Sequence, residues 1–127
     1  MTRLILAAGA FIALDRNDRP MWARMVLAHR SEQPIVTHAG IIGQIWRNPA
    51  RQARLAQALK AVDVRPLGLE LAQAAGQLLA AAGRHDVHDA ALALLCEPDD
   101  LLFTSDIDDL ATLLAERRVR SVGILRV

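Results

Sequence analysis

Several residue types are scarce in this 127-residue chain, and each scarcity argues against a class of protein. A single cysteine, Cys96, excludes an intrachain disulfide and fits a reducing, cytoplasmic location. Two Phe, two Trp and no Tyr leave too few rings for the base-stacking platforms of single-strand binders. Basic and acidic residues nearly cancel (15 against 14), which argues against nucleic-acid binding by bulk charge and leaves only a local basic patch.

No apolar run is long enough to span a bilayer, so no membrane partner is expected. The run from Leu4 to Leu14 follows Arg3 and has the outline of a short secretory signal, which is one interpretation. The other, which we favour, divides it into a strand over Leu4–Ala7, a break at Gly9 and a helix beyond. The 53% hydrophobic content disfavours disorder, and the length predicts one domain over residues 1–127.

Apolar periodicity predicts strands and helices in alternation along the whole chain. The expected strands are Leu4–Ala7, Ile35–Val36, Val62–Val64, Leu101–Phe103 and Val119–Leu125. The expected helices carry Phe11–Leu14 and Met21–Ser31, followed by His38–Trp46, Pro49–Lys60, Leu69–Ala82, Val87–Leu95 and Ile107–Ala115, with Thr37 and Ser105 as N-caps of the third and the last. This alternation predicts an α/β fold, a single three-layer α/β/α domain with a mostly parallel central sheet.

Carboxylates stand at the starts of the last two predicted helices. Asp86 and Asp89 are one turn apart in GRHDVHDAALALL, and Asp106 follows a buried strand in LLFTSD. Chemistry in parallel sheets collects beyond the carboxyl ends of the strands, so Asp106 should face the same crevice as Ala7 at the end of the first strand. Helix capping is the alternative role for such residues. Asp89 opens an apolar helix, where an unpaired carboxylate is costly and a cation would offset the cost.

Four segments together make the chain resemble the PIN-domain ribonucleases, in particular the VapC-type toxins of bacterial toxin–antitoxin pairs. They are LILAAGAFIALDR, VTHAGIIGQIWR, DAALALL and TSDIDDL, in this order across essentially the whole chain. The resemblance implies a PIN-like fold in which acidic residues hold Mg²⁺ or Mn²⁺ and activate water for RNA cleavage. It also implies an RNA substrate, a cognate antitoxin protein that wraps the toxin, and a toxin homodimer.

Carried over residue by residue, Asp89 and Asp106 match two of the family's acidic ligands, and Asp86 is a further candidate. Ala7 stands where the family has its opening Asp, and Gln44 stands where a Glu is usual. Gln44 keeps an acceptor oxygen and loses one charge, whereas Ala7 has no ligand atom for a hard cation. We therefore expect weak metal binding and little or no turnover, whether Ala7 is an engineered or a natural change.

Two further patterns and two other functions stay open. His85 and His88 invite a zinc interpretation, although no Cys or third His lies at a recognisable spacing. Arg47, Arg51 and Arg54 form a predicted stripe at i, i+4 and i+7 that either faces solvent or contacts the RNA backbone. A catalytically silent protein that only binds an antitoxin or RNA is the main alternative function. A receiver-like domain is disfavoured, because its acidic cluster belongs at the end of strand one, where this chain has alanines.

Overall fold

The computed structural model describes residues 2–127. The strands in this part of the chain are β1 (Leu4–Leu6), β2 (Ile35–His38), β3 (Asp63–Arg65), β4 (Leu101–Thr104) and β5 (Gly123–Arg126). The helices are α1 (Ala8–Asp15), α2 (Arg19–Arg30), α3 (Ala39–Ile45), α4 (Ala53–Leu59), α5 (Leu69–Ala82), α6 (Val87–Leu95) and α7 (Ile107–Arg117), with a short 3₁₀ helix at Pro49–Arg51. All the described strands are parallel, which confirms the predicted α/β class.

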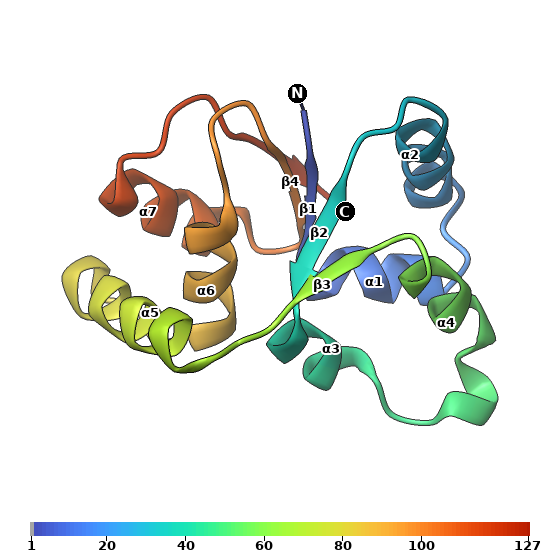
Figure 1. The fold of residues 1–127 in the computed structure, drawn as a ribbon, viewed down its shortest axis with the longest axis horizontal. Coiled ribbons are helices and arrows are strands. Elements are labelled where there is room, and N and C mark those ends of the chain that lie inside the picture. The colour runs from blue at the N-terminus through green and yellow to red at the C-terminus, as the bar shows by residue number, and fades with distance from the viewer. Residues whose placement is uncertain (1) are drawn as a thin grey trace.

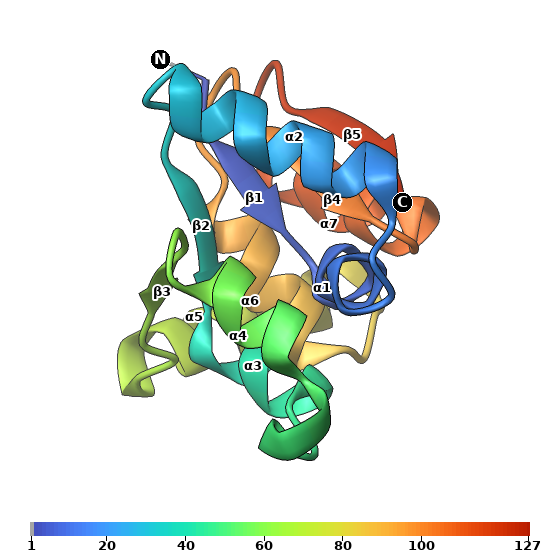
Figure 2. The same cartoon turned by 90° about the vertical axis from the view of Figure 1, so that its right-hand side faces the viewer.

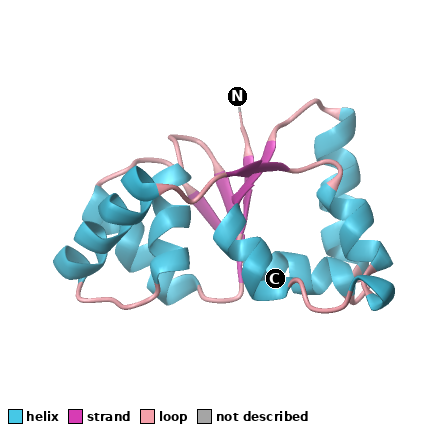
Figure 3. Cartoon of the chain, turned by 60° about the horizontal axis from the view of Figure 1, so that its bottom comes forward, coloured by secondary structure: helices cyan, strands magenta, loops and turns pink. Residues whose placement is uncertain are grey.

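Helices cover both faces of this sheet, which gives the predicted three layers. Figure 1 shows α5, α6 and α7 on one side and α1, α2 and α4 on the other, with α3 beyond the lower end of β2. Figure 2 looks onto the second side and shows α2 lying across it, and Figure 3 shows the strands gathered between the two groups of helices. None of the helices in residues 2–127 combines the length and the apolar character that a bilayer span requires.

The strand order, β3-β2-β1-β4-β5, determines where side chains can meet. The chain moves outward from β1 to β3 and then returns to the other side of β1 for β4 and β5. A switch point therefore lies between β1 and β4, whose register pairs Leu4 with Leu101 and Leu6 with Phe103. Ligands of open α/β sheets bind beyond the carboxyl ends of the strands at such a point.

The N-cap predicted for the third helix is wrong by one residue. Thr37 lies inside β2, where its Oγ1 donates a hydrogen bond to the carbonyl of Leu6 at 2.8 Å. His38 is the N-cap of α3, and its Nδ1 accepts from the amide of Gly40 at 3.1 Å. A buried hydroxyl needs a partner, and the neighbouring β1 carbonyl supplies it. The strand extends two residues further than its apolar pattern indicates, to His38.

Ser105 is likewise not the cap of α7. The carboxylate of Asp106 accepts from the amide of Asp109 at 3.2 Å and caps the helix. The amide of Asp106 in turn donates to Oγ1 of Thr104, the last residue of β4, at 2.9 Å. This short turn fixes the path from the strand end into the helix, and the capping role considered for Asp106 is confirmed.

The helix predicted over Pro49–Lys60 is interrupted. Its start is the 3₁₀ turn Pro49–Arg51, and α4 begins only at Ala53. The break is at Gln52, whose buried side chain accepts from the amides of Arg47 and Asn48 at 2.8 and 3.0 Å. The same side chain donates from Nε2 to the carbonyl of Ile45 at 2.9 Å, so it pairs with the loop before the 3₁₀ turn, and this local structure competes with a continuous helix.

Two predicted strands are displaced by the turns before them. The strand expected at Val62–Val64 is β3, one residue later, and the strand expected at Val119–Leu125 contracts to β5. Arg118 and Ser121 have left-handed backbone conformations, with φ values of 62° and 61°. These residues turn the chain between α7 and β5. The first apolar residues of the predicted strand, Val119 and Val122, therefore pack against the core from a loop.

An ion pair joins the starts of β1 and β4 at the amino end of the sheet. Arg3 donates to Asp100 through Nη2 at 2.7 Å and Nε at 3.1 Å, and Nη2 also donates to the carbonyl of Leu95 at 2.9 Å. Asp100 is 1% exposed, and its carboxylate also accepts from the amide of Glu97 at 2.7 Å. The pair raises the pKa of Arg3 and keeps the guanidinium charged. Both charges are therefore compensated inside the protein.

We expect Asp100→Ala to lower the free energy of unfolding by about 3 kcal/mol, because it leaves the partly buried guanidinium of Arg3 without its counter-charge. Asp63→Ala is the matched control, since it breaks the exposed Arg65–Asp63 pair, also 2.7 Å long, and should cost less than about 1 kcal/mol. Urea unfolding measures both. Equal losses would contradict the structural role of the Arg3–Asp100 pair.

Candidate metal centre

The carboxyl ends of β1 and β4 meet at one edge of the sheet, as predicted. The amide of Ala7, directly after β1, donates to the carbonyl of Phe103 in β4 at 3.0 Å. Two residues on, a Cβ atom on Gly9 would lie 2.6 Å from Oγ of Ser105 in the loop after β4. The start of α1 thus packs directly against the turn that carries Asp106, and Ala7 is buried beside it at 3% exposure.

Two helices, α6 and α7, lie on the other face of the sheet from α1 and begin in the same way. In α6 the carboxylate of Asp86 caps the helix and accepts from the amides of His88 and Asp89 at 2.9 and 3.2 Å. In α7, Asp106 caps the helix through the amide of Asp109. Each helix therefore has an Asp at its N-cap and a second Asp three residues later.

The adjacent helices bring three of these carboxylates together. Asp89, Asp106 and Asp109 each offer one oxygen, and these oxygens all lie within 4.8 Å of one another. Asp86 lies outside this group. Asp109 was not among the predicted ligands, although its three-residue spacing from Asp106 repeats the spacing of Asp86 and Asp89. That repeat was the available signal for it.

The carboxylate group is electrostatically strained without a cation. Burial, the largest cause, followed by the neighbouring carboxyl groups of Asp109, Asp86 and Asp106, raises the pKa of Asp89 to about 8. One oxygen of Asp109, Oδ2, is buried and has no hydrogen-bond partner in the described part of the chain. Its other oxygen lies 3.6 Å from Nη1 of Arg84.

A hard divalent cation fits this arrangement. Mg²⁺ and Mn²⁺ select carboxylate oxygens, and the three clustered groups supply these from two rigid helix starts. The unpartnered Oδ2 of Asp109 and the protonation that the cluster imposes on Asp89 are both relieved when positive charge enters. Ala7 adds no ligand to the same edge, so the oxygens gathered there come from α6 and from Asp106 and Asp109 at the start of α7.

Gln44 lies on the helix that borders this edge. It is half-buried on α3, one turn after Gly40 and on the same side of the helix. Gly40 packs closely on α6, since a Cβ atom there would lie 2.5 Å from Nδ1 of His88. Gln44 therefore lies on the same side of α3 as the contact with α6, one turn further along the helix. Its role as a catalytic residue stays a prediction.

His88 pairs with His38, a contact between residues 50 positions apart that the sequence alone does not indicate. The rings of His38 and His88 stack with centroids 6.0 Å apart, and Nε2 of His38 lies 2.9 Å from the carbonyl of His88. Because Nδ1 of His38 accepts from Gly40, its Nε2 carries the proton and donates to that carbonyl. Burial, the largest cause, lowers the pKa of His38. The pair anchors the start of α6 to the end of β2.

The zinc interpretation gains no support from this pairing. His88 stacks on His38, and His85 is exposed in the loop before α6. Within residues 2–127, the group with metal-ligand geometry consists of aspartates alone. The donor atoms gathered at this edge are hard oxygens, which favour magnesium or manganese over zinc.

The predicted arginine stripe is not a feature of one helix. Arg47 follows α3, Arg51 ends the 3₁₀ turn and Arg54 lies in α4. Nη1 of Arg47 donates to the carbonyls of Gly43 and Trp46 at 2.9 and 2.7 Å, which terminates α3. The stripe is broken because the chain turns at Gln52, between Arg51 and the start of α4. Contact of these exposed arginines with an RNA backbone stays a prediction.

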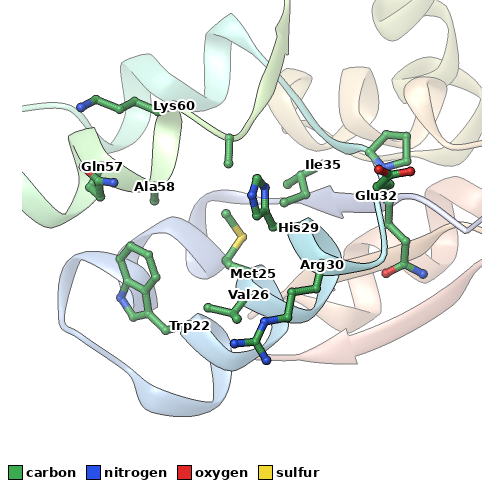
Figure 4. A pocket seen from close by; sticks show the side chains of 13 residues that line it. Trp22, Met25, Val26, His29, Arg30, Glu32, Ile35, Gln57, Ala58 and Lys60 are labelled. Carbon is green, nitrogen blue, oxygen red and sulfur yellow. The ribbon is translucent and has the colours of Figure 1, made fainter.

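A groove of about 770 Å³ lies away from the carboxylates, between α2 and α4. Figure 4 shows Trp22, Met25 and Val26 of α2 facing it, with Ala58 of α4 opposite and Ile35 at the start of β2. The ends of both helices lead into strand starts, so the groove opens toward the amino edge of the sheet. The carboxylate group and the groove thus lie at opposite edges of the sheet.

Comparisons with known proteins identify the fold. No family model matches the chain, and no curated protein matches it in sequence. Among solved structures, a chain of the crystal structure of VapBC2 from Rickettsia felis bound to a DNA fragment from their promoter superposes with a TM-score of 0.67 at 11% identity. The superposition covers 100% of this chain and 99% of that chain. This chain has the VapC-type PIN fold, as its sequence motifs predict.

In the metal-free protein, we expect the free energy of unfolding to fall as the pH rises from about 7 to 8. Native Asp89 keeps a proton up to about pH 8, whereas the unfolded carboxyl has released it above about pH 4. The native state therefore binds more protons, and raising the pH favours unfolding by at most about 1.4 kcal/mol per pH unit. Urea unfolding in chelator measures this slope.

Asp89→Asn should flatten that slope and stabilise the metal-free protein at pH 8. Asp108→Asn is the control, because it removes the same charge from an exposed position on the adjacent helix and should retain the slope. A native protein whose stability is constant or rises over this interval would show that Asp89 is already ionised at pH 7.

Proposed function

We propose that this chain is a metal-dependent endoribonuclease toxin of the VapC type, with its hydrolysis of RNA phosphodiester bonds impaired by Ala7. The observation that carries the proposal is the group of three carboxylates at the switch point between β1 and β4. A VapC-type fold supports the assignment to this class. The alternative is a protein of the same fold that binds an antitoxin or RNA without chemistry.

The proposed roles follow from the positions of the side chains. Asp89, Asp106 and Asp109 would hold Mg²⁺ or Mn²⁺, and the ion would supply Lewis-acid activation of the phosphate and of a water. Asp86 fixes the first turn of α6 through the amide of Asp89 and adds negative charge nearby. Gln44 offers an amide oxygen from α3 as a hydrogen-bond acceptor. Since Asp89 must lose a proton to bind the ion, metal affinity rises with pH up to about 8.

Ala7 accounts for the proposed impairment. It lies at the end of β1 beside β4, where a longer acidic side chain would project into the same crevice. Alanine supplies neither charge nor a ligand atom there, so the ion is held from the α6 and α7 side only. The scissile phosphate would then be positioned poorly, which lowers turnover more than it lowers binding of RNA.

The partner that we propose is an antitoxin whose amphipathic helix occupies the groove between α2 and α4. The structural neighbour is a VapBC2 complex, which supports a protein partner for this fold. Val26 is 45% exposed beside the half-buried Trp22, so the floor of the groove is apolar and open. Arg30 and Lys60 lie on its rim. A helix with an apolar stripe flanked by acidic residues matches this surface.

Ala7→Asp should create Mg²⁺- or Mn²⁺-dependent RNA cleavage that a chelator abolishes. The expected gain is at least about a hundredfold over the native chain, since even neighbours of metal ligands cost up to that factor when lost. Cleavage of a structured RNA panel measures it. The double variant Ala7→Asp/Asp106→Asn is the control and should return to the native level.

The melting temperature of Ala7→Asp, measured with and without Mg²⁺, shows whether the variant folds and binds the metal. It thereby distinguishes cleavage at the proposed site from cleavage by a contaminating nuclease. The new carboxylate would be buried, so Ala7→Asp should lower the melting temperature in chelator and recover it with Mg²⁺. Restored metal response without cleavage would favour the binding-only alternative. No metal response and no cleavage would contradict the proposed nuclease centre.

Val26→Glu should weaken binding of the antitoxin, taken as the protein encoded beside this gene, by about tenfold or more. The substitution places a charge on the apolar floor and adds repulsion toward an acidic helix. Isothermal titration calorimetry measures the affinity. Leu69→Glu is the matched control, because Leu69 is 74% exposed on α5, on the opposite side of the sheet. Equal effects of the two variants would place the partner elsewhere.

A further inference from the structure

Arg84 is held at the edge of the carboxylate group by both its backbone and its side chain. Gly83 ends α5 in the left-handed conformation, φ 67°, and the amide of Arg84 donates back to the carbonyl of Leu79 at 3.1 Å. This closure fixes the main chain at Arg84. Its Nη2 donates to Oγ1 of Thr112 at 3.0 Å, and its Nη1 lies 3.6 Å from Oδ1 of Asp109.

These contacts leave donors of the guanidinium free. The guanidinium of arginine has five N–H donors. In the described part of the chain, Nη2 of Arg84 donates to Thr112 and Nη1 faces Asp109. The side chain is 40% exposed, whereas that of Asp109 is 13% exposed. The remaining donors therefore point to solvent beside a carboxylate that lies deeper in the crevice.

Arg84 is also distinguished by its charge environment. Within residues 2–127, it makes the one ion pair that involves the carboxylate group, while the other pairs join Arg3 or Arg65 to acids elsewhere. An RNA phosphate that approaches three carboxylates meets repulsion. A fixed, permanently charged guanidinium at the same edge reduces this repulsion, and its planar fork matches two phosphate oxygens.

We propose that Arg84 binds the backbone phosphate of RNA next to the metal-holding carboxylates and so positions the substrate. This inference rests on the proposed nuclease function. Asp109 and Thr112 hold the guanidinium at the crevice in advance, so little side-chain freedom is lost when the phosphate binds. Arg84 is thus a binding residue of the substrate, distinct from the arginines that follow α3.

RNA binding by the native chain tests the proposal, because its expected low turnover leaves the RNA intact. Fluorescence anisotropy of a labelled single-stranded RNA in Mg²⁺ gives the affinity at several salt concentrations. We expect Arg84→Ala to weaken binding about tenfold and to reduce the salt dependence by about 0.7 of a log–log slope unit, the loss of one phosphate contact. Arg84→Lys keeps the charge and loses the fork, so its affinity should be intermediate.

Arg120→Ala is the matched control. It removes one positive charge from the exposed loop between α7 and the start of β5, at the amino edge of the sheet and away from the carboxylates, and should leave RNA affinity unchanged. Mn²⁺ affinity, measured by electron paramagnetic resonance without RNA, and the melting temperature are recorded for every variant. For Arg84→Ala the Mn²⁺ affinity should stay at or above the native value, since no ligand is lost, whereas the melting temperature should fall slightly because Asp109 loses its counter-charge.

The outcomes separate the two levels of inference. Unchanged RNA affinity in Arg84→Ala overturns the role of Arg84 and leaves the nuclease proposal standing. Loss of RNA affinity together with loss of Mn²⁺ affinity also overturns it, because Arg84 would then act only by orienting Asp109. If neither the native chain nor Ala7→Asp binds or cleaves RNA, the proposed function fails and this inference fails with it.

Discussion

The parallel pairing of β1 with β4 is the constraint on which the acidic edge depends. These strands are neighbours in the sheet although 97 residues separate Arg3 from Asp100, whose ion pair ties their starts together. Because both strands are short and their register is continuous, the ion pair at their amino ends also determines which residues lie at their carboxyl ends. A slip of one residue would move every side chain of β1 to the opposite face of the sheet and into the wrong helical layer. The position of Asp106 beside Ala7 follows from the same register.

The carboxylates themselves oppose folding. Two helices deliver acids that repel one another, and burial adds to the cost, as the raised pKa of Asp89 shows. Few neighbouring groups compensate this repulsion. The N-cap carboxylates accept hydrogen bonds from backbone amides, and Arg84 contacts Asp109. The hydrogen bond from His38 holds the start of α6 in place. A cation bound by these carboxylates would offset the repulsion, and MgCl₂-dependent stability would follow from it.

Much of this arrangement was predictable from the chain alone, and the rest was not, for identifiable reasons. Alternating apolar segments predicted the layers and the parallel sheet. The strand end before Asp106 and the helix start at Asp89 predicted that these two carboxylates lie at one edge. Asp109 escaped because three acids in DIDD also fit an exposed first turn of a helix. The His38–His88 contact and the Arg3–Asp100 pair join residues 50 and 97 positions apart, which periodicity does not address.

The helix break at Gln52 has a related cause. Propensity favours a helix throughout that segment, and one buried amide side chain overrides it by pairing with backbone groups of the preceding loop. Such competition depends on where the loop lies in three dimensions. The local sequence therefore predicted whether each segment is a helix or a strand, but it did not predict the residues at which the segment begins and ends. The candidate site residues lie at these ends.

The burial of Cys96 makes the molecule convenient for spectroscopy. Its thiol is fully enclosed and contacts the carbonyl of Leu92 at 3.5 Å, and burial, the largest cause, raises its pKa to about 12. Maleimides and methanethiosulfonates react with exposed thiolates, so the native thiol is inert toward them. A cysteine introduced on the surface would then be the sole attachment point for a fluorophore or spin label. Distances between labelled helices could be followed without first replacing a core residue.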